Sequence, residues 1–448
     1  MRILLVSPRG EFLCRSEGFA EFMQNSREMR TILHFWNGIG VALPTIAALT
    51  PEGHAVEIID ENQEAVDFDG RYDLVGVTAM TQQAVRAYAI ADAFRARGVH
   101  VAIGGIHATV MPEEAARHAD TVFVGEAENS WPQFVTDLAH GVAKPVYNQA
   151  DFPPVDLDRT PVPRFDLLAK YRYPVIYVQA SRGCPHDCEF CVASNVYGRR
   201  YKFRSVERVV DDIREAKKHW KFAQIGFADD NLFASRRYSR SLVEAFSAMR
   251  FSWFGVCDIS VAEDEVFLEA LHESGCRTLL VGFETTCEEN LRQLDKNQWK
   301  LRQFSKYPEY VERIQSWGIG VYGSFILGLD EDDHETPQQI IDFINRNNLM
   351  GAQITILTPF PGSRLRDRLV AEGRVIHDQW NWYTVWNAVI HHKNFSPEEL
   401  ESKLLEIYQG VYNPVSNARR SEYFGRVCRQ LVNRRASDDE RRAESTGA

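Results

Sequence analysis

The stretch Cys184-Pro-His-Asp-Cys188-Glu-Phe-Cys191 decides which fold is expected, because it places three cysteines in one short loop. The nearest other cysteine along the chain is Cys257, so the loop lacks a fourth thiol close by in sequence. Iron–sulfur clusters are usually held by four thiolates, and three would leave one iron open. Structural zinc sites instead pair CxxC knuckles and close with a fourth ligand. The spacing therefore favours an iron–sulfur cluster over zinc.

The cysteine loop directly follows the first of a series of strands that alternate with helices. Between the strands, apolar residues recur at helical spacing with charged residues on the opposite face, which indicates amphipathic helices. Active sites of βα barrels lie at the carboxyl ends of the strands, which is where this loop stands. Six such units are too few for a full eight-fold barrel. We expect the six strands at residues 175–180, 224–228, 253–257, 278–282, 320–326 and 353–357.

The first 145 residues form a separate alternating series, with an amphipathic helix expected over residues 83–97. Strand–helix alternation predicts a parallel sheet covered on both faces. Five strands in this order favour a flavodoxin-like, doubly wound α/β domain, which binds ligands beyond the carboxyl ends of its strands. We expect these strands at residues 2–6, 54–59, 73–77, 100–104 and 121–124.

Two further segments complete the predicted organisation. Residues 146–170 contain four prolines and are expected to be a linker between domains. The barrel is then expected over residues 171–365, followed by a helical C-terminal region over 366–448. From Arg419 onward arginine outnumbers acidic residues, and we expect this basic end to be a frayed, disordered tail.

Composition limits the classes of function. The net charge of −11 gives no basic footprint for nucleic acid. The eight cysteines do not form a disulfide framework, which fits a reducing cytoplasm. No stretch approaches the roughly 18 uninterrupted apolar residues of a membrane span, and the N-terminal apolar run is too short for a signal peptide. We expect a cytoplasmic protein without a membrane span and without a nucleic-acid partner.

The cysteine loop resembles that of the radical S-adenosylmethionine (SAM) superfamily, whose CxxxCxΦC loop binds three irons of a 4Fe-4S cluster. The fourth iron of that cluster takes the amino and carboxylate groups of SAM. Phe190 supplies the aromatic residue Φ. The resemblance implies that Cys184, Cys188 and Cys191 ligate the cluster and form the catalytic centre, and that the six units form a partial (β/α)6 barrel.

The same resemblance implies SAM-binding residues at the ends of later strands. Asp229 or Asp230 would accept a hydrogen bond from the amino group of SAM, and Glu284 would bind the ribose hydroxyls. Gly328 and Leu357 would lie against the adenine. The alternatives are an ordinary helix cap at the aspartates and ordinary core packing at the apolar positions.

Three strand ends in the N-terminal domain resemble the cobalamin-binding half of cobalamin-dependent radical SAM enzymes. Small residues there would let a flat macrocycle lie against the backbone. The Asp-x-His-x-x-Gly signature that supplies an imidazole to cobalt is absent, and His107 is expected to be a hydrogen-bonding or packed residue. The residues implied to contact cobalamin are Thr78, Met80, Thr81, Gly104, Gly105, His107, Gly125 and Glu126.

An aromatic segment near the C-terminus contains Trp380, Trp382, Tyr383 and Trp386. These side chains could cover the barrel mouth and grip an apolar substrate. They could equally dock the C-terminal helices.

The family resemblance implies a cobalamin-dependent radical SAM methyltransferase. Its cofactors would be a 4Fe-4S cluster, SAM and cobalamin, and a 5′-deoxyadenosyl radical with methylcobalamin would methylate an unactivated carbon of a small molecule. An external donor such as flavodoxin or ferredoxin would supply the electron. Two alternatives stay open, namely a cyclase or rearrangement catalyst with the same cofactors, and an iron–sulfur redox protein that does not cleave SAM.

Overall fold

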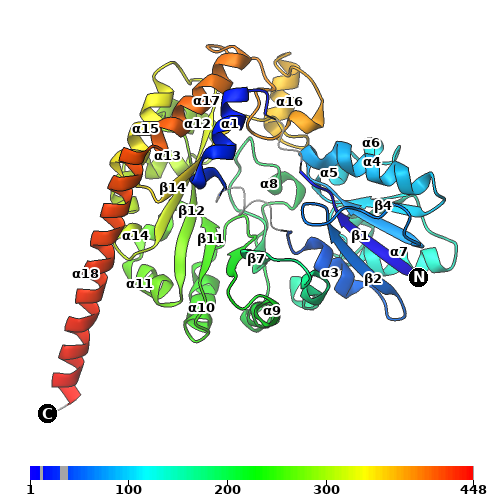
Figure 1. Cartoon of the computed structure of the whole chain (residues 1–448), viewed down its shortest axis with the longest axis horizontal. Helices are drawn as coiled ribbons and strands as arrows, with labels where there is room; N and C mark the ends of the chain where they lie inside the picture. Colours follow the sequence, from blue (N-terminus) through cyan, green and yellow to red (C-terminus); the bar gives the residue numbers. More distant parts are fainter. Residues whose placement is uncertain (11–13, 31–38, 447–448) are drawn as a thin grey trace.

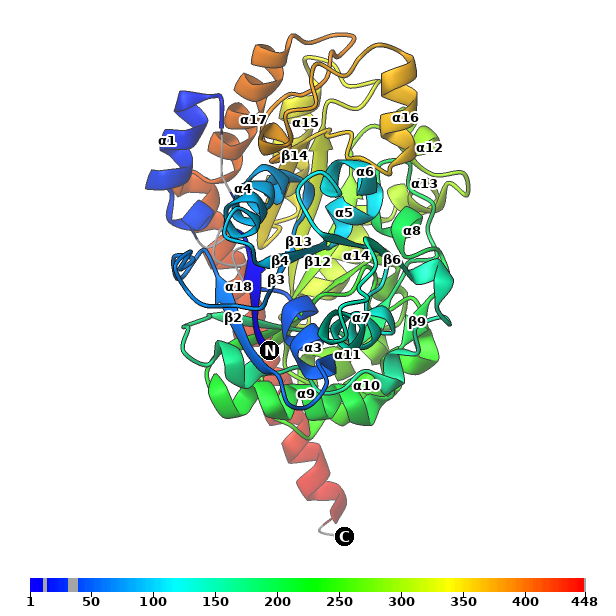
Figure 2. The same cartoon turned by 90° about the vertical axis from the view of Figure 1, so that its right-hand side faces the viewer.

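The computed structural model describes residues 1–10, 14–30 and 39–446. It contains two parallel sheets, each covered by helices, which lie side by side in the molecule (Figure 1). The N-terminal sheet lies on the right of Figure 1, the second sheet lies in the centre and left, and a long C-terminal helix projects away from both. In Figure 2 the N-terminal sheet lies in front of the second sheet.

The N-terminal sheet has the strand order β2-β1-β3-β4-β5-β6, and all its pairs are parallel. From β1 the chain adds β2 on one side and β3 to β6 on the other, so the topological switch point lies between β1 and β3, as in a flavodoxin-like doubly wound sheet. The five predicted strands are confirmed. A sixth strand, β6, lies at the start of the segment predicted to be a linker. Its three residues pair with β5 before the prolines begin. The strands are β1 (Arg2–Ser7), β2 (Ala55–Asp60), β3 (Leu74–Thr78), β4 (His100–Gly104), β5 (Thr121–Val124) and β6 (Val146–Asn148).

Helices cover both faces of this sheet, so its central strands are buried on both sides. Every residue from Ile3 to Val6 and from Leu74 to Val77 is buried, which is the continuous apolar pattern of parallel strands. The predicted helix over 83–97 is confirmed as α4 (Ala84–Arg95), preceded by one 3₁₀ turn, η1 (Thr81–Gln83). The other helices around this sheet are α3 (Ala42–Leu49), α5 (Ile106–Val110), α6 (Pro112–Ala115) and α7 (Ser130–Ala139). Helix α1 (Glu17–Asn25) packs instead against the C-terminal helix over Pro397–Val411.

The second sheet has the strand order β7-β10-β11-β12-β13-β14, again with parallel pairs throughout. All six predicted strands are confirmed. Over the described residues β7 and β14 are the two edges and do not pair with each other, so the sheet is a partial barrel. The strands are β7 (Val175–Val178), β10 (Gln224–Phe227), β11 (Trp253–Cys257), β12 (Cys276–Glu284), β13 (Gly320–Leu327) and β14 (Gly351–Ile356).

The helices between these strands pack their apolar faces on the outside of the sheet. In α9 (Val206–His219) the buried side chains include Val209, Val210 and Ile213, as the helical spacing of the sequence predicts. The other helices of this region are α8 (Ala193–Val196), α10 (Arg236–Ser247), α11 (Glu265–Glu273), α12 (Glu288–Leu294), α13 (Trp299–Phe304), α14 (Tyr307–Gln315) and α15 (Thr336–Arg346). Short 3₁₀ turns occur at η2 (Gln149–Asp151), η3 (Leu157–Arg159), η4 (Phe165–Leu168) and η5 (Ile259–Glu263).

The C-terminal region consists of α16 (Arg364–Ala371), η6 (Trp380–Trp382), α17 (Pro397–Val411) and α18 (Pro414–Thr446). The tail that we expected to be disordered is instead the distal part of α18, which extends away from the body in Figure 1. Alanine, arginine and glutamate are strong helix formers, and the chain after Gly425 has neither proline nor glycine before Gly447. Local propensity therefore outweighs the high charge that suggested disorder.

Candidate active site between the two sheets

The cysteine loop is bracketed by a small hairpin at the carboxyl end of β7. This hairpin pairs β8 (Ser181–Arg182) with β9 (Lys202–Phe203) in antiparallel fashion. Gly183, directly before Cys184, has a φ of +90°, and a Cβ there would lie 2.7 Å from the carbonyl oxygen of Arg200. Only glycine fits this position without strain. The hairpin therefore fixes where the loop leaves the barrel.

The three thiols of the loop are half-buried and close to one another. Burial is the main cause that raises the pKa of Cys184 to about 11 and that of Cys188 to about 12, and the proximity of Cys191 is a smaller cause in the same direction. Such thiols become stable thiolates only beside a strong positive charge, which bound iron supplies. Over the described residues, no three His, Cys, Asp or Glu side chains gather as one single-ion site would need. Three half-buried thiols on one short loop fit the thiolate set that an iron–sulfur cluster would take.

Asp229 and Asp230 follow β10 and bond to the segment that leads into the cysteine loop. Asp229 is buried, and its carboxylate accepts hydrogen bonds from the amides of Ala180 and Ser181 and from the hydroxyl of Ser181. Burial nevertheless raises its pKa to about 7. Asp230 is half-buried, and its Oδ2 accepts a hydrogen bond of 2.9 Å from the amide of Gly183. Asp229 thus anchors the hairpin, whereas Asp230 lies beside Cys184 at the more accessible position.

Glu284 ends β12 on the other side of the cysteine loop. Its φ of +67° is unusual for a residue with a side chain, and the register of β12 against β13 shifts just before it. The Nζ of Lys300, on α13, lies 2.9 Å from Oε1 of Glu284, and both side chains are largely buried. Lys300 also lowers the pKa of Cys188, so this buried cation lies close to the cluster loop. The helical pattern around Lys300 carries no signal that would have identified it.

Leu357, one of the two residues expected to lie against the adenine, lines a pocket. Its empty space is about 330 Å³, including the part open to solvent. Gly328 lies next to this pocket with a φ of +95°, and a Cβ there would meet Leu400 only at 3.5 Å. The positive φ therefore explains why a glycine stands at this position. The pocket is lined by Phe190, Leu294, Leu329, Leu357 and Leu365, and by the polar residues Glu189, Asn290, Gln293, Asp330 and Arg368.

The predicted cobalamin residues lie at the carboxyl ends of β3, β4 and β5. Met80 is 55% exposed there, which leaves an apolar side chain available to a flat ligand. His107 is buried, and its ring nitrogens lie 3.3 Å from the hydroxyl of Thr81 and 3.4 Å from the carboxylate of Glu114. Burial lowers the pKa of this histidine. The structure thus gives His107 the packed, hydrogen-bonded role that was expected for it.

The glycines at this edge have different structural reasons. Gly105 has a φ of +94°, and a Cβ there would lie 2.7 Å from Oγ1 of Thr78. Gly125 has a φ of +86°, and its Cβ would lie 2.9 Å from Cβ of Gln149. The backbone conformation and the close protein contacts therefore require glycine at both positions. Gly104 is different, because a Cβ there would make only ordinary contact with Phe123 at 3.4 Å.

The carboxyl ends of the two sheets face each other, and ion pairs join them. Arg182, in the hairpin beside the cysteine loop, lies 2.6 Å from Oε1 of Glu126 and 2.8 Å from Oε1 of Glu128, both of which follow β5. Lys202, on the other strand of the hairpin, lies 2.7 Å from the same Glu126 oxygen. The carboxylate of Glu126 is thus paired with the second sheet. The carboxyl ends of β3, β4 and β5 are thereby held opposite the cysteine loop.

The aromatic segment docks the C-terminal region rather than lining the open barrel. The indole nitrogen of Trp380 donates to Glu114 of α6 at 2.9 Å, and its ring packs against His107 with 5.4 Å between centroids. Tyr383 and Trp386 are buried, and Trp386 packs against Phe19 of α1. The second alternative expected docking of the C-terminal helices, whereas Trp380 contacts α6 and Trp386 contacts α1.

One residue at a strand end was missed from sequence. Asp258 follows β11, and its carboxylate lies 3.5 Å from Nε2 of His186 in the cysteine loop. It also accepts hydrogen bonds from Asn231 at 3.0 Å and from the amide of Ser260 at 2.9 Å, and these partners hold its pKa far below the usual range. Its position directly after a predicted strand was the one signal that could have found it.

Fold and site together define a class. The molecule has the architecture of an iron–sulfur enzyme of the partial-barrel type, whose N-terminal, doubly wound domain presents its ligand-binding edge to the cysteine loop. None of the helices over the described residues is both long and apolar enough to cross a membrane.

Comparison with known proteins identifies the family within that class. A model of the B12 binding domain matches residues 31–135, and a model of the radical SAM superfamily matches residues 178–344. Bacteriochlorophyllide d C-8(2)-methyltransferase of Chlorobaculum tepidum is 30% identical, over 83% of this chain and 85% of its own length. Hopanoid C-2 methylase of Rhodopseudomonas palustris is 29% identical, over 84% of this chain and 71% of its own length.

A solved structure shows the same fold. The radical SAM methyltransferase TsrM of Kitasatospora setae, with cobalamin and a [4Fe-4S] cluster bound, superimposes with a TM-score of 0.64 at 19% identity, over 83% of this chain and 78% of that chain. The present chain belongs to the cobalamin-dependent radical SAM enzymes, the radical SAM proteins with an N-terminal B12-binding domain. The family and the fold class expected from the sequence are confirmed.

Proposed function

We propose that the protein is a methyltransferase that uses a 4Fe-4S cluster, SAM and cobalamin to methylate an unactivated carbon of a small molecule. Relatives that match most of the chain are named as C-methyltransferases and methylases, which supports this choice. The observation that carries it is the facing pair of sheet edges joined through Arg182 and Glu126. A methyl carrier and a radical source must act on one substrate, and this arrangement brings their sites together.

The chain's own residues bind and orient these groups. Cys184, Cys188 and Cys191 hold the cluster, and Asp230 and Glu284 orient SAM from opposite sides of the loop. Phe190 and Leu357 provide the apolar wall for its adenine. When bound, the cluster supplies an electron for cleavage of SAM, and cobalamin supplies the methyl group.

The test uses protein purified and reconstituted without oxygen. With methyl-labelled SAM, we expect label in the protein-bound cobalamin and formation of S-adenosylhomocysteine, together with 5′-deoxyadenosine under reducing conditions. 5′-Deoxyadenosine without any methyl transfer would favour a cyclase or rearrangement catalyst instead. A cluster spectrum without SAM cleavage would favour an iron–sulfur redox protein. We also propose that flavodoxin or ferredoxin reduces the cluster and that the protein works in the cytoplasm, which reduction assays with each donor and fractionation of cells would test.

A further inference from the structure

Helix α16 is not part of the barrel strands, but its residues form hydrogen bonds to the cysteine loop on both sides of Cys188. The guanidinium of Arg364 donates to the carbonyl oxygen of Asp187 at 2.8 Å, and its Nη2 lies 3.0 Å from Oδ1 of the same residue. The amide of Leu365 donates to the carbonyl oxygen of Glu189 at 3.1 Å. The backbone on each side of this cluster ligand is therefore tied to one helix.

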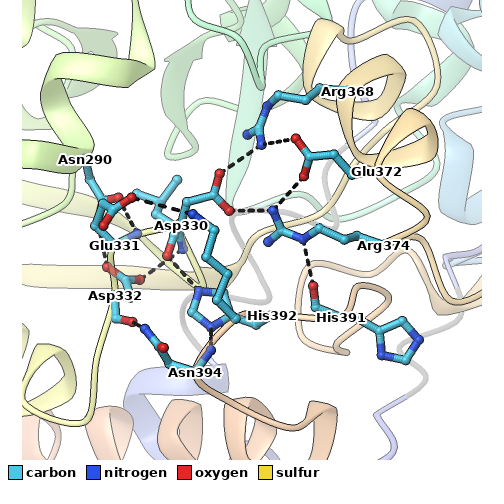
Figure 3. A network of polar contacts seen from close by, with 12 residues as sticks. Asn290, Asp330, Glu331, Asp332, Arg368, Glu372, Arg374, His391, His392 and Asn394 are labelled. Carbon is cyan, nitrogen blue, oxygen red and sulfur yellow. Dashed lines mark hydrogen bonds and ion pairs between the residues drawn. The ribbon is translucent and has the colours of Figure 1, made fainter.

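Arg368, one turn further along α16, joins this loop to the end of β13. Its Nε and Nη2 donate to the two carboxylate oxygens of Glu189 at 2.8 and 3.2 Å. Its Nη1 donates to Oδ2 of Asp330 at 2.8 Å. Figure 3 shows Arg368 pointing from α16 toward Asp330. A planar guanidinium can satisfy two carboxylates at once in fixed geometry, which an ammonium group cannot do.

The end of β13 is itself held rigidly, so it can serve as a fixed reference for the loop. The carboxylate of Asp332 accepts from the amides of Gly328 and Leu329 at 2.8 and 3.0 Å and from Asn290 at 2.8 Å. His392 lies 2.8 Å from the carbonyl oxygen of Leu329. These contacts surround Asp330 in Figure 3.

Arg374 provides a second hold on Asp330 that does not involve the cysteine loop. Its Nη1 lies 2.7 Å from Oδ1 of Asp330, and its Nε donates to the carbonyl oxygen of His391 at 2.9 Å. Arg368 and Arg374 also share Glu372, at 3.2 and 3.0 Å. Within this network, Arg368 is the arginine that reaches Glu189.

We propose that Arg368 is a positioning residue that sets the spacing between the cysteine loop and the end of β13. The pocket between these two segments has Phe190 on the loop side and Leu329 on the strand side. This inference rests on the proposed function, because it is the adenine of SAM that this pocket would receive. Loss of the link would let the loop shift against the strand end while the three cysteines stay present.

The test compares Arg368→Gln with wild type after anaerobic reconstitution, using SAM as the probe. We expect full iron content, SAM affinity lowered about tenfold or more, as the loss of charge-assisted hydrogen bonds implies, and an altered change in the electron paramagnetic resonance spectrum of the reduced cluster on addition of SAM. Glu189→Gln should reproduce both effects in weaker form. Arg368→Lys, which keeps the charge without the fork, should restore SAM binding only in part.

Arg374→Gln is the matched control, because it removes an arginine from the same Asp330 and Glu372 but leaves Glu189 paired. It should lower the melting temperature as much as Arg368→Gln and leave the cluster spectrum unchanged. Equal loss of SAM affinity in both variants, or normal SAM affinity in Arg368→Gln, would overturn the proposal. If wild type itself binds no cluster or does not cleave SAM, the proposed function fails, which is a distinguishable result.

Discussion

Asp229 and Asp230 are neighbours in sequence, but the structure separates their roles. Both carboxylate oxygens of Asp229 accept hydrogen bonds from the amides and hydroxyl of the β7–β8 turn, and the residue is buried. One carboxylate oxygen of Asp230 accepts a hydrogen bond from the amide of Gly183, and the half-buried side chain lies beside Cys184. From sequence the two could not be distinguished, because both follow the same strand. Their difference depends on which way the turn directs each side chain.

We therefore predict that Asp230→Asn weakens SAM binding by about 1.5–3 kcal/mol, because one charge-assisted hydrogen bond is weakened or lost. The cluster spectrum without SAM should be unchanged. Calorimetric titration with SAM measures the affinity. Asp229→Asn is the comparison, and we expect it to lower thermal stability more than affinity. If Asp230→Asn binds SAM as wild type does, Asp229 or Glu284 must accept the amino group.

The cysteine prediction concerns iron. Cys184→Ala, Cys188→Ala and Cys191→Ala should each lose the cluster and SAM cleavage, since each removes one of three thiolates. Iron and sulfide analysis together with the absorption spectrum measure this loss. Cys428→Ala is the control and should keep full iron content, because Cys428 is exposed on α18. Cys257 is a poorer control than its sequence position suggests, because it is buried at the end of β11. SAM cleavage by a cluster-free Cys188→Ala protein would refute the radical mechanism.

At the scale of elements, strands were predictable because buried parallel strands appear as short apolar runs between turn residues. Strand β6 was not, because its three residues lie next to a proline-rich segment and only their pairing with β5 makes them a strand. The positions of α16 and α17 in the fold could not be predicted from the sequence either. Their contacts join residues far apart in the chain, such as Arg368 with Glu189, and no local pattern records them.

Helix α17 closes the free edge of the barrel through two tyrosines one turn apart. The hydroxyl of Tyr408 donates to the carbonyl oxygen of Ile354 at 2.9 Å and accepts from its amide at 3.1 Å. Tyr412 does the same to Ala352, at 2.7 and 2.8 Å. These hydroxyls take the place of a neighbouring strand along β14. An uncovered strand edge is otherwise a template for pairing with other chains.

We predict that Tyr408→Phe lowers the free energy of unfolding by about 1–3 kcal/mol, because it leaves buried backbone groups without a partner. The double variant with Tyr412→Phe should also aggregate more readily. Thermal denaturation and light scattering measure the two effects. Tyr423→Phe is the control, because the hydroxyl of Tyr423 donates to the exposed Glu312. In the variant, water can take the place of that hydroxyl at the Glu312 carboxylate. A Tyr408→Phe protein as stable as this control would show that the edge needs no cap.

At the scale of the whole molecule, the arrangement of the two domains determines the site. Each domain could be predicted alone, because its alternation of strands and helices is local. Their facing edges could not, since Arg182, Glu126 and Glu128 look like ordinary surface charges in sequence. In the structure, their side chains are each less than one-sixth exposed, at 14%, 12% and 11%. A largely buried interdomain ion pair of this kind fixes relative position more than it adds stability.

The last prediction is that the protein depends on cobalamin held at the edge formed by β3, β4 and β5. Gly105 is an unsuitable position for a bulky probe, because its backbone conformation and its contact with Thr78 would make any side chain disrupt the turn itself. Gly104 is suitable, since a Cβ there makes only ordinary contact and no positive φ is needed. Gly104→Leu should therefore exclude a flat macrocycle by overlap and keep the fold. Met80→Glu should weaken the binding of cobalamin, because it replaces an exposed apolar side chain with a charged one.

Val142→Glu is the matched control for Met80→Glu, because Val142 is 63% exposed in the loop before β6, at the opposite edge of the same sheet. We expect the two cobalamin-edge variants to retain little cobalamin after gel filtration and to form no methylated product, while their clusters still cleave SAM to 5′-deoxyadenosine. The control should match wild type in all three measurements. Selective loss of this kind follows because the cysteines lie on the other sheet and stay intact. Equal turnover with and without cobalamin in wild type would instead mean that the N-terminal sheet only docks against the barrel.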